Sequence, residues 1–170
     1  MNIIRKFQIY LFFFTALFLT TCKNKKNVDV SNISLDIKVE RFDKDLSSLS
    51  PTNFKDKLPA LSAKYENFYN DYMAGMLSVG SPDDPIFISN LNTVLNTPDY
   101  NALKQEVALK YPDLNEPEEQ LTNAFKHVKY YYPNQKAPKI ITFFSGIAIQ
   151  VPIGDNYIGI GLDMFLGADS

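Results

Sequence analysis

Residues 139–162, which read KIITFFSGIAIQVPIGDNYIGIGL, decide the fold of this chain. Along this stretch apolar side chains either alternate with polar ones or follow one another without a helical period, a pattern that is typical of β-strands. Three strands are expected, over residues 139–144, 147–151 and 157–162. Gly154-Asp155-Asn156 is a natural hairpin loop between the last two. The sequence therefore predicts a late antiparallel meander.

An earlier strand is expected at residues 33–40, which read ISLDIKVE. Apolar residues occupy every second position there, so they share one face of the strand while polar residues share the other. This pattern predicts a half-buried strand.

Between the early and late strands, apolar residues recur at threes and fours, the spacing that places side chains on one face of a helix. The first helix is expected over residues 54–76, with a kink or a start at Pro59, because proline lacks a backbone N–H. Three more are expected over residues 86–95, 98–111 and 116–132, the last with a buried stripe formed by Leu121, Phe125 and Val128. One early strand, a four-helix middle and a late meander predict an α+β domain over residues 33–170, with its helices packed on one face of the sheet.

The N-terminal segment has the layout of a secretory signal. Arg5 and Lys6 precede the apolar run Ile9 to Leu19, which is too short for the roughly 20 residues of a transmembrane helix. Leu19-Thr20-Thr21-Cys22 resembles the bacterial lipobox, in which the cysteine is acylated and the peptide is cut just before it. We therefore expect a lipoprotein signal peptide at residues 1–21, with a soluble secreted protein and an uncleaved anchor as alternatives.

Residues 22–32 follow as a polar tether that begins at the acylated Cys22. The formal net charge of the whole chain is −2, and its clearest basic cluster is Lys23, Lys25 and Lys26. Nucleic-acid binding needs a clustered cationic surface on the folded part, so no nucleic-acid partner is expected. The lysine cluster is better placed to contact lipid headgroups or to keep the tether solvated.

The sequence offers no catalytic set. His127 is the only histidine, so a zinc site with two histidines cannot be built from these residues. It lies between Phe125 and Val128 of the expected stripe, which favours a half-exposed helical histidine over a catalytic one. We expect no catalytic residue, no metal ligand and no cofactor within the chain.

The last predicted strand contains the residues that most strongly indicate a groove or a contact with a partner. Gly159 and Gly161 indicate a close approach of backbone or of a partner to the strand. Asp163 ends an apolar run, where an unpaired buried carboxylate is costly, so it has a partner, lines a groove, or is exposed at the end of the strand. Together with Tyr157, these residues are the predicted groove or partner contact.

Three segments resemble the gliding motility-associated lipoprotein family GldB of the Bacteroidetes: IKVERFDKDL at 37–46, PKIITF at 138–143 and GIGLDMFLG at 159–167. The resemblance implies an outer-membrane lipoprotein that is needed for gliding and connected with the type IX secretion apparatus. Thr21 departs from the small residue usual in the lipobox. Family members continue beyond the position of Ser170, so the resemblance also implies that the domain is incomplete at its C-terminus.

The family fold resembles the front half of a zincin-like metallopeptidase, whose metal-binding helix follows an antiparallel edge strand. Three functions therefore stay open. The first is a non-catalytic lipoprotein that faces the periplasm and supports a motility or secretion assembly through protein partners. The second is a zinc peptidase, active or degenerate, with a metal site beyond residue 170 and with the strand 157–162 lining its substrate groove. The third, suggested only by the aromatic content, is a lipid-anchored binder of a small ligand.

Overall fold

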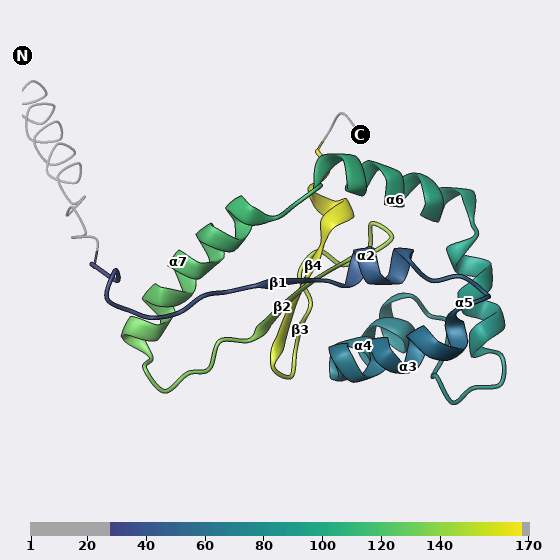
Figure 1. Ribbon diagram of the computed structural model, residues 1–170, viewed down its shortest axis with the longest axis horizontal. Coiled ribbons are helices and arrows are strands. Elements are labelled where there is room, and N and C mark those ends of the chain that lie inside the picture. Colours follow the sequence, from purple (N-terminus) through teal and green to yellow (C-terminus); the bar gives the residue numbers. More distant parts are fainter. Residues whose placement is uncertain (1–27, 168–170) are drawn as a thin grey trace, which may run out of the picture.

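The computed structural model describes residues 28–167, in which helices surround a four-stranded mixed sheet (Figure 1). The order across the sheet is β1-β2-β4-β3. Pairs β1–β2 and β2–β4 are parallel, and β3–β4 is antiparallel. The strands are β1 (Val39–Arg41), β2 (Lys139–Phe143), β3 (Ile153–Gly154) and β4 (Tyr157–Gly161). The predicted α+β class is confirmed.

The predicted antiparallel meander is wrong, because β2 and β4 run parallel. Residues 147–151, expected to be its middle strand, instead form an exposed loop after β2. Gly146 (φ 65°) and Ile147 (φ 59°) adopt left-handed backbone conformations there, which interrupt an extended strand. Only the hairpin around Gly154-Asp155-Asn156 is antiparallel as expected. Parallel pairing requires a long crossover, which residues 144–156 provide between β2 and β4.

The early strand is shorter than predicted, although its two faces are as expected. The ladder with β2 covers only Val39–Arg41. Upstream, Ile37 is buried and Ile33 and Leu35 are half-buried, while the intervening polar residues Ser34, Asp36 and Lys38 are exposed. The alternation therefore reports which face is buried, whereas the length of the ladder depends on how far β2 extends.

The first predicted helix is broken at Glu66, whose backbone has a φ of 50°. Residues 54–76 form α3 (Phe54–Tyr65), with Pro59 inside it, then α4 (Asn67–Asn70) and the π-helical turn η2 (Asp71–Met76). The other three predicted helices are present as α5 (Phe87–Leu95), α6 (Pro98–Lys110) and α7 (Asn115–Tyr131). Two short elements were not predicted: α2 (Phe42–Ser47) and the 3-10 turn η3 (Leu162–Phe165).

The core lies between one face of the sheet and the helices α2 to α6. Phe42 of α2 is fully buried, and its ring centroid lies 4.8 Å from that of Tyr65, 5.1 Å from that of Phe68 and 4.9 Å from that of Tyr72. Phe68 in turn contacts Phe143 of β2, at 5.8 Å between ring centroids. These edge-on aromatic contacts join the helices to the sheet.

The expectation that all helices pack on one face of the sheet is also wrong, because α7 covers the opposite face. Val39, Thr142 and Ile160 point toward α7 from three neighbouring strands, whereas Phe143, the next residue along β2, points into the aromatic core. The two faces of a strand alternate, so a sheet with helices on both faces has apolar residues at successive positions, as β2 does.

Candidate functional site

Helix α7 is held against the sheet along the free edge of β1. The Glu118 carboxylate accepts a hydrogen bond from the Val39 backbone N–H at 2.9 Å, and the Thr122 hydroxyl accepts one from the Ile37 N–H at 3.0 Å. Lys38 also donates to Glu118, at 3.2 Å. Side chains of α7 thus satisfy the backbone donors that an edge strand would otherwise leave open to another chain.

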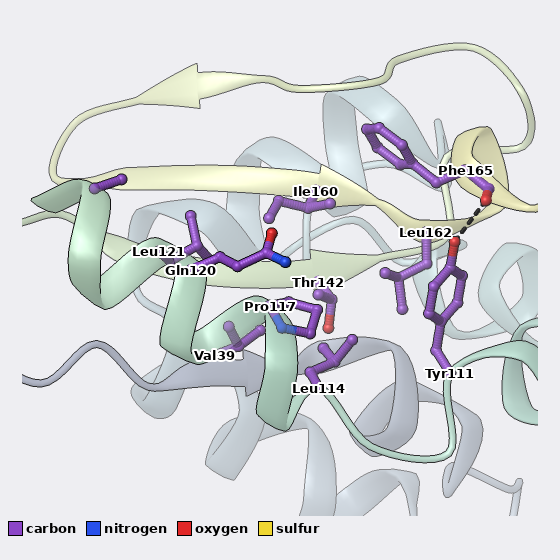
Figure 2. A pocket seen from close by; sticks show the side chains of 11 residues that line it. Val39, Tyr111, Leu114, Pro117, Gln120, Leu121, Thr142, Ile160, Leu162 and Phe165 are labelled. Carbon is purple, nitrogen blue, oxygen red and sulfur yellow. Dashed lines mark hydrogen bonds between the residues drawn. The ribbon is translucent and has the colours of Figure 1, made fainter.

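Between this attachment and the body of the sheet, an apolar cleft of about 580 Å³ opens under α7 (Figure 2). No residue of α7 is buried. The prediction of a buried stripe is wrong: Leu121 and Phe125 are only half-buried, and Val128 is 39% exposed. The residues that line the cleft are Val39, Tyr111, Leu114, Pro117, Gln120, Leu121, Ala124, Thr142, Ile160, Leu162 and Phe165.

The polar groups at the cleft are already engaged within the chain. The Tyr111 hydroxyl donates to the Phe165 carbonyl at 2.5 Å at one end of the cleft. At the floor, the Thr142 hydroxyl donates to the buried carboxylate of Asp43, which forms a salt bridge with Arg41 at 2.7 Å. The cleft therefore presents mainly carbon to a ligand, and its lining suits burial of apolar groups.

A second constellation lies where the parallel strands β2 and β4 end side by side. Asp163, only 6% exposed, accepts hydrogen bonds from the Ser145 N–H (2.8 Å), the Ser145 hydroxyl (2.7 Å) and the Ile147 N–H (2.8 Å). The Ser145 hydroxyl in turn accepts from the Ala148 N–H at 3.3 Å. Asp163 thus fixes the loop that follows β2, because its carboxylate satisfies the donors of that loop.

Two tyrosines from η2 and β4 add hydrogen bonds on the core side of the sheet. The Tyr72 hydroxyl donates to the Phe144 carbonyl at 3.0 Å, and burial raises the pKa of that hydroxyl well above its usual value. The Tyr157 hydroxyl donates to Asp71 at 2.7 Å; burial first, and then this carboxylate, raise the pKa of Tyr157. Both phenols remain protonated donors at neutral pH.

The structure places the four predicted contact residues of β4 and η3 against their own chain. Tyr157 is buried, and a Cβ atom added to Gly159 would lie 2.8 Å from Pro152 Cγ. A Cβ atom added to Gly161 would lie 2.7 Å from the Ile149 carbonyl oxygen. The close approach that the glycines predicted is therefore made by residues 149–152, and a contact of these four residues with a partner stays a prediction. Cys22 lies outside the described residues.

Replacing Gly161 by alanine is expected to lower the free energy of unfolding by about 2 kcal/mol, because the added methyl group overlaps a backbone carbonyl that cannot move without shifting the loop. Gly75 provides the matched control: no atom lies within 4 Å of an added Cβ, and Gly75→Ala is expected to be neutral or slightly stabilising. Urea unfolding of both purified variants measures the difference, and equal midpoints would contradict the packing argument.

The cleft itself was not predicted from the sequence. Ile158 and Ile160 alternate with the glycines of β4, which indicates a second apolar face, but nothing in that pattern shows what covers it. Tyr111 and Phe165 are distant in sequence and meet only through the packing of η3 against the segment between α6 and α7. Such contacts leave no periodic signal.

Two further findings concern residues 28–167 alone. No three or more His, Cys, Asp or Glu side chains in that range are grouped so that they could hold a metal ion. The zincin-like metallopeptidase alternative, whose metal site was expected beyond residue 170, stays a prediction. His127 is half-buried, and its Nδ1 lies 2.9 Å from the Asn123 carbonyl oxygen. None of the helices in this range is long and apolar enough to cross a membrane.

Comparison with known proteins gives one match. A family model described as gliding motility protein GldB matches residues 23–170. No curated protein and no solved structure matches the chain.

Proposed function

The chain belongs to the GldB family of gliding motility lipoproteins, and from this premise we propose that it is a non-catalytic, lipid-anchored component of the gliding and type IX secretion machinery, on the periplasmic side of the outer membrane. Family membership implies a function related to gliding motility. We propose the lipid anchor, the location at the outer membrane, the link to the secretion apparatus and the binding role.

The apolar cleft under α7 is the observation that carries the binding role. Its volume of about 580 Å³ accommodates a few apolar side chains. The Thr142 hydroxyl donates to Asp43, the Tyr111 hydroxyl to the Phe165 carbonyl and the Gln120 amide to Glu116. A preformed apolar cleft of this kind favours insertion of apolar anchor residues from a protein partner. We propose that a partner in the motility assembly places such residues there.

The anchor follows from the sequence before the described residues. Acylation of Cys22 would hold the domain at the membrane, and residues 23–27 are polar and basic, as a tether at a headgroup surface requires. Basic residues directly after the cysteine differ from the acidic tags that direct lipoproteins of this group to the cell surface. This difference supports the periplasmic side.

A complementation experiment tests the two parts separately. In a strain that lacks the gene, the wild-type chain is expected to restore gliding, whereas Ala124→Trp, which fills the cleft, is expected to abolish it at an unchanged protein level. The matched control is Ala102→Trp, at an exposed alanine of α6 that does not line the cleft. Cys22→Ser is expected to lose labelled palmitate.

The outcomes are distinct. Normal gliding with Ala124→Trp would mean that the cleft is not needed for gliding. Normal gliding of the deletion strain would mean that the protein has no role in motility. Palmitate labelling that persists in Cys22→Ser would place the anchor elsewhere.

A further inference from the structure

The C-terminal end of α7 exposes three consecutive tyrosines, Tyr130, Tyr131 and Tyr132, with exposed fractions of 52%, 61% and 67%. We propose that this tyrosine end rests on the phospholipid headgroups of the membrane to which the chain is anchored, and so sets the orientation of the domain. The inference rests on the lipid anchor of the proposed function.

The first residues that the structure describes, 28–31, lie against the C-terminal half of α7. Val28 and Val30 line a shared depression with Asn123, Lys126 and His127, and Val30 is buried. Figure 1 shows the first described residues next to the lower end of α7, from which the chain continues toward β2. The six steps from Cys22 to Val28 span at most roughly 20 Å. An acylated Cys22 would therefore hold the tyrosine end within about that distance of the bilayer surface.

The charge around the tyrosine end suits anionic headgroups. Residues 120–154 contain no Asp or Glu, and their four basic residues are Lys126, Lys129, Lys136 and Lys139. Lys139 is paired with Glu66 at 3.1 Å, whereas the other three form no salt bridge within residues 28–167. The carboxylates that flank this range in the sequence are Glu119, in the N-terminal half of α7, and Asp155, in the β3–β4 turn. Asp29 lies in the depression beside Lys126. Lys23, Lys25 and Lys26 of the tether precede Val28 closely in the sequence and add positive charge to this part of the chain.

The side chains at this end have the chemistry of a membrane interface. A tyrosine ring is apolar along its body and polar at its hydroxyl, so it is stable at headgroup depth, where lysine ammonium groups reach phosphates. The rings of Tyr130 and Tyr131 contact each other edge to face at 5.1 Å between centroids, and Val128, one turn earlier, is also exposed. The end of α7 therefore offers an aromatic and basic surface rather than a helix that inserts.

The chain contains no tryptophan, so a single introduced tryptophan reports its own surroundings. The full acylated chain carrying Tyr131→Trp is reconstituted in vesicles of phosphatidylethanolamine and phosphatidylglycerol. Its fluorescence is expected to shift to the blue and to be quenched by lipids brominated on the acyl chains. The matched control is Leu109→Trp. Leu109 is 83% exposed and precedes the N-terminal end of α7, a helix about 25 Å long that carries the tyrosines at its other end. This variant is expected to show neither effect.

A second measurement does not depend on the anchor. The unacylated Cys22→Ser chain is sedimented with the same vesicles. It is compared with a variant that also carries Lys126→Gln, Lys129→Gln and Lys136→Gln. Each lysine near an anionic surface contributes about a fivefold change in affinity, so the triple variant is expected to bind roughly 100-fold more weakly. The matched control carries Lys55→Gln, Lys104→Gln and Lys110→Gln, at lysines that form no salt bridge within residues 28–167. Its binding is expected to be nearly unchanged.

Failure of this inference can be told apart from failure of the anchor. Labelled palmitate on the wild-type chain, together with an unquenched Tyr131→Trp variant, would overturn the membrane contact and leave the anchor standing. Absence of the label would overturn the anchor. Sedimentation of the unacylated chain with vesicles would then show by itself whether the tyrosine end contacts the membrane. A blue shift that appears only in the purified motility assembly, without quenching by brominated lipid, would assign the tyrosine end to a protein and overturn the proposal.

Discussion

Replacing Asp163 by alanine is expected to lower the free energy of unfolding by about 3 kcal/mol, because three donors lose a buried charged acceptor at once. The carboxylate is 6% exposed and holds the loop in which Ile147 has a φ of 59°. A β-branched residue in that region is strained, and the hydrogen bond from its N–H to Asp163 helps to keep it there. Loss of the carboxylate therefore removes the bonds and releases the loop.

Urea unfolding followed by circular dichroism measures this change. Asp163→Asn keeps the size of the side chain and one acceptor oxygen, so an intermediate loss is expected. The matched control is Asp155→Ala in the exposed β3–β4 turn, for which a change within about 0.5 kcal/mol is expected. If Asp163→Ala unfolded at the same urea concentration as this control, Asp163 would have no role in fixing the loop.

Phe42→Ala is expected to be the most destabilising substitution, with a loss of about 4 kcal/mol. The Phe42 ring is fully buried and contacts the rings of Tyr65, Phe68 and Tyr72, so its removal leaves a cavity where α2 meets α3, α4 and η2. Surrounding aromatic rings cannot fill such a cavity without losing their own contacts.

Thermal or urea unfolding of Phe42→Ala is compared with that of Phe165→Ala. Phe165 is 43% exposed at the rim of the cleft, and its carbonyl, which accepts the Tyr111 hydrogen bond, is unchanged by the substitution. A loss below about 1 kcal/mol is expected for this control. A similar loss in the two variants would mean that the core does not depend on α2.

Sequence patterns predicted most of the helices, because periods of three and four identify a face that must be buried. The helix predicted over residues 98–111 is α6, which begins at Pro98 with the Thr97 hydroxyl accepting from the Tyr100 N–H at 3.3 Å. The break at Glu66 was missed, because the apolar spacing continues through it from Tyr65 to Phe68. A pattern of side chains cannot show a backbone turn that keeps the same face buried.

The candidate site was predicted only in part. The glycines of β4 correctly indicated a close approach, but whether their own chain or a partner approached was left open. Asp163 was expected to have a partner, to line a groove or to be exposed, and only the folded chain shows that Ser145 and Ile147 surround it. The cleft joins residues from β1 to η3, so no local pattern could reveal it.

The sequence alone therefore determined most of the helical segments, the strands at residues 139–143 and 157–161, the buried face of the early strand, the α+β class and the resemblance to the family that the comparison then confirmed. Tertiary structure decided the direction of β2 relative to β4, the break at Glu66, the placement of α7 on the second face and the cleft beneath it. The physical reason is that a two-residue period encodes which side of a strand is buried, but not which strand it pairs with or in which direction. Those choices follow from burying both faces of the sheet under helices, and the strands that the helices cover come from distant parts of the sequence, β1 at residues 39–41 and β2 at residues 139–143.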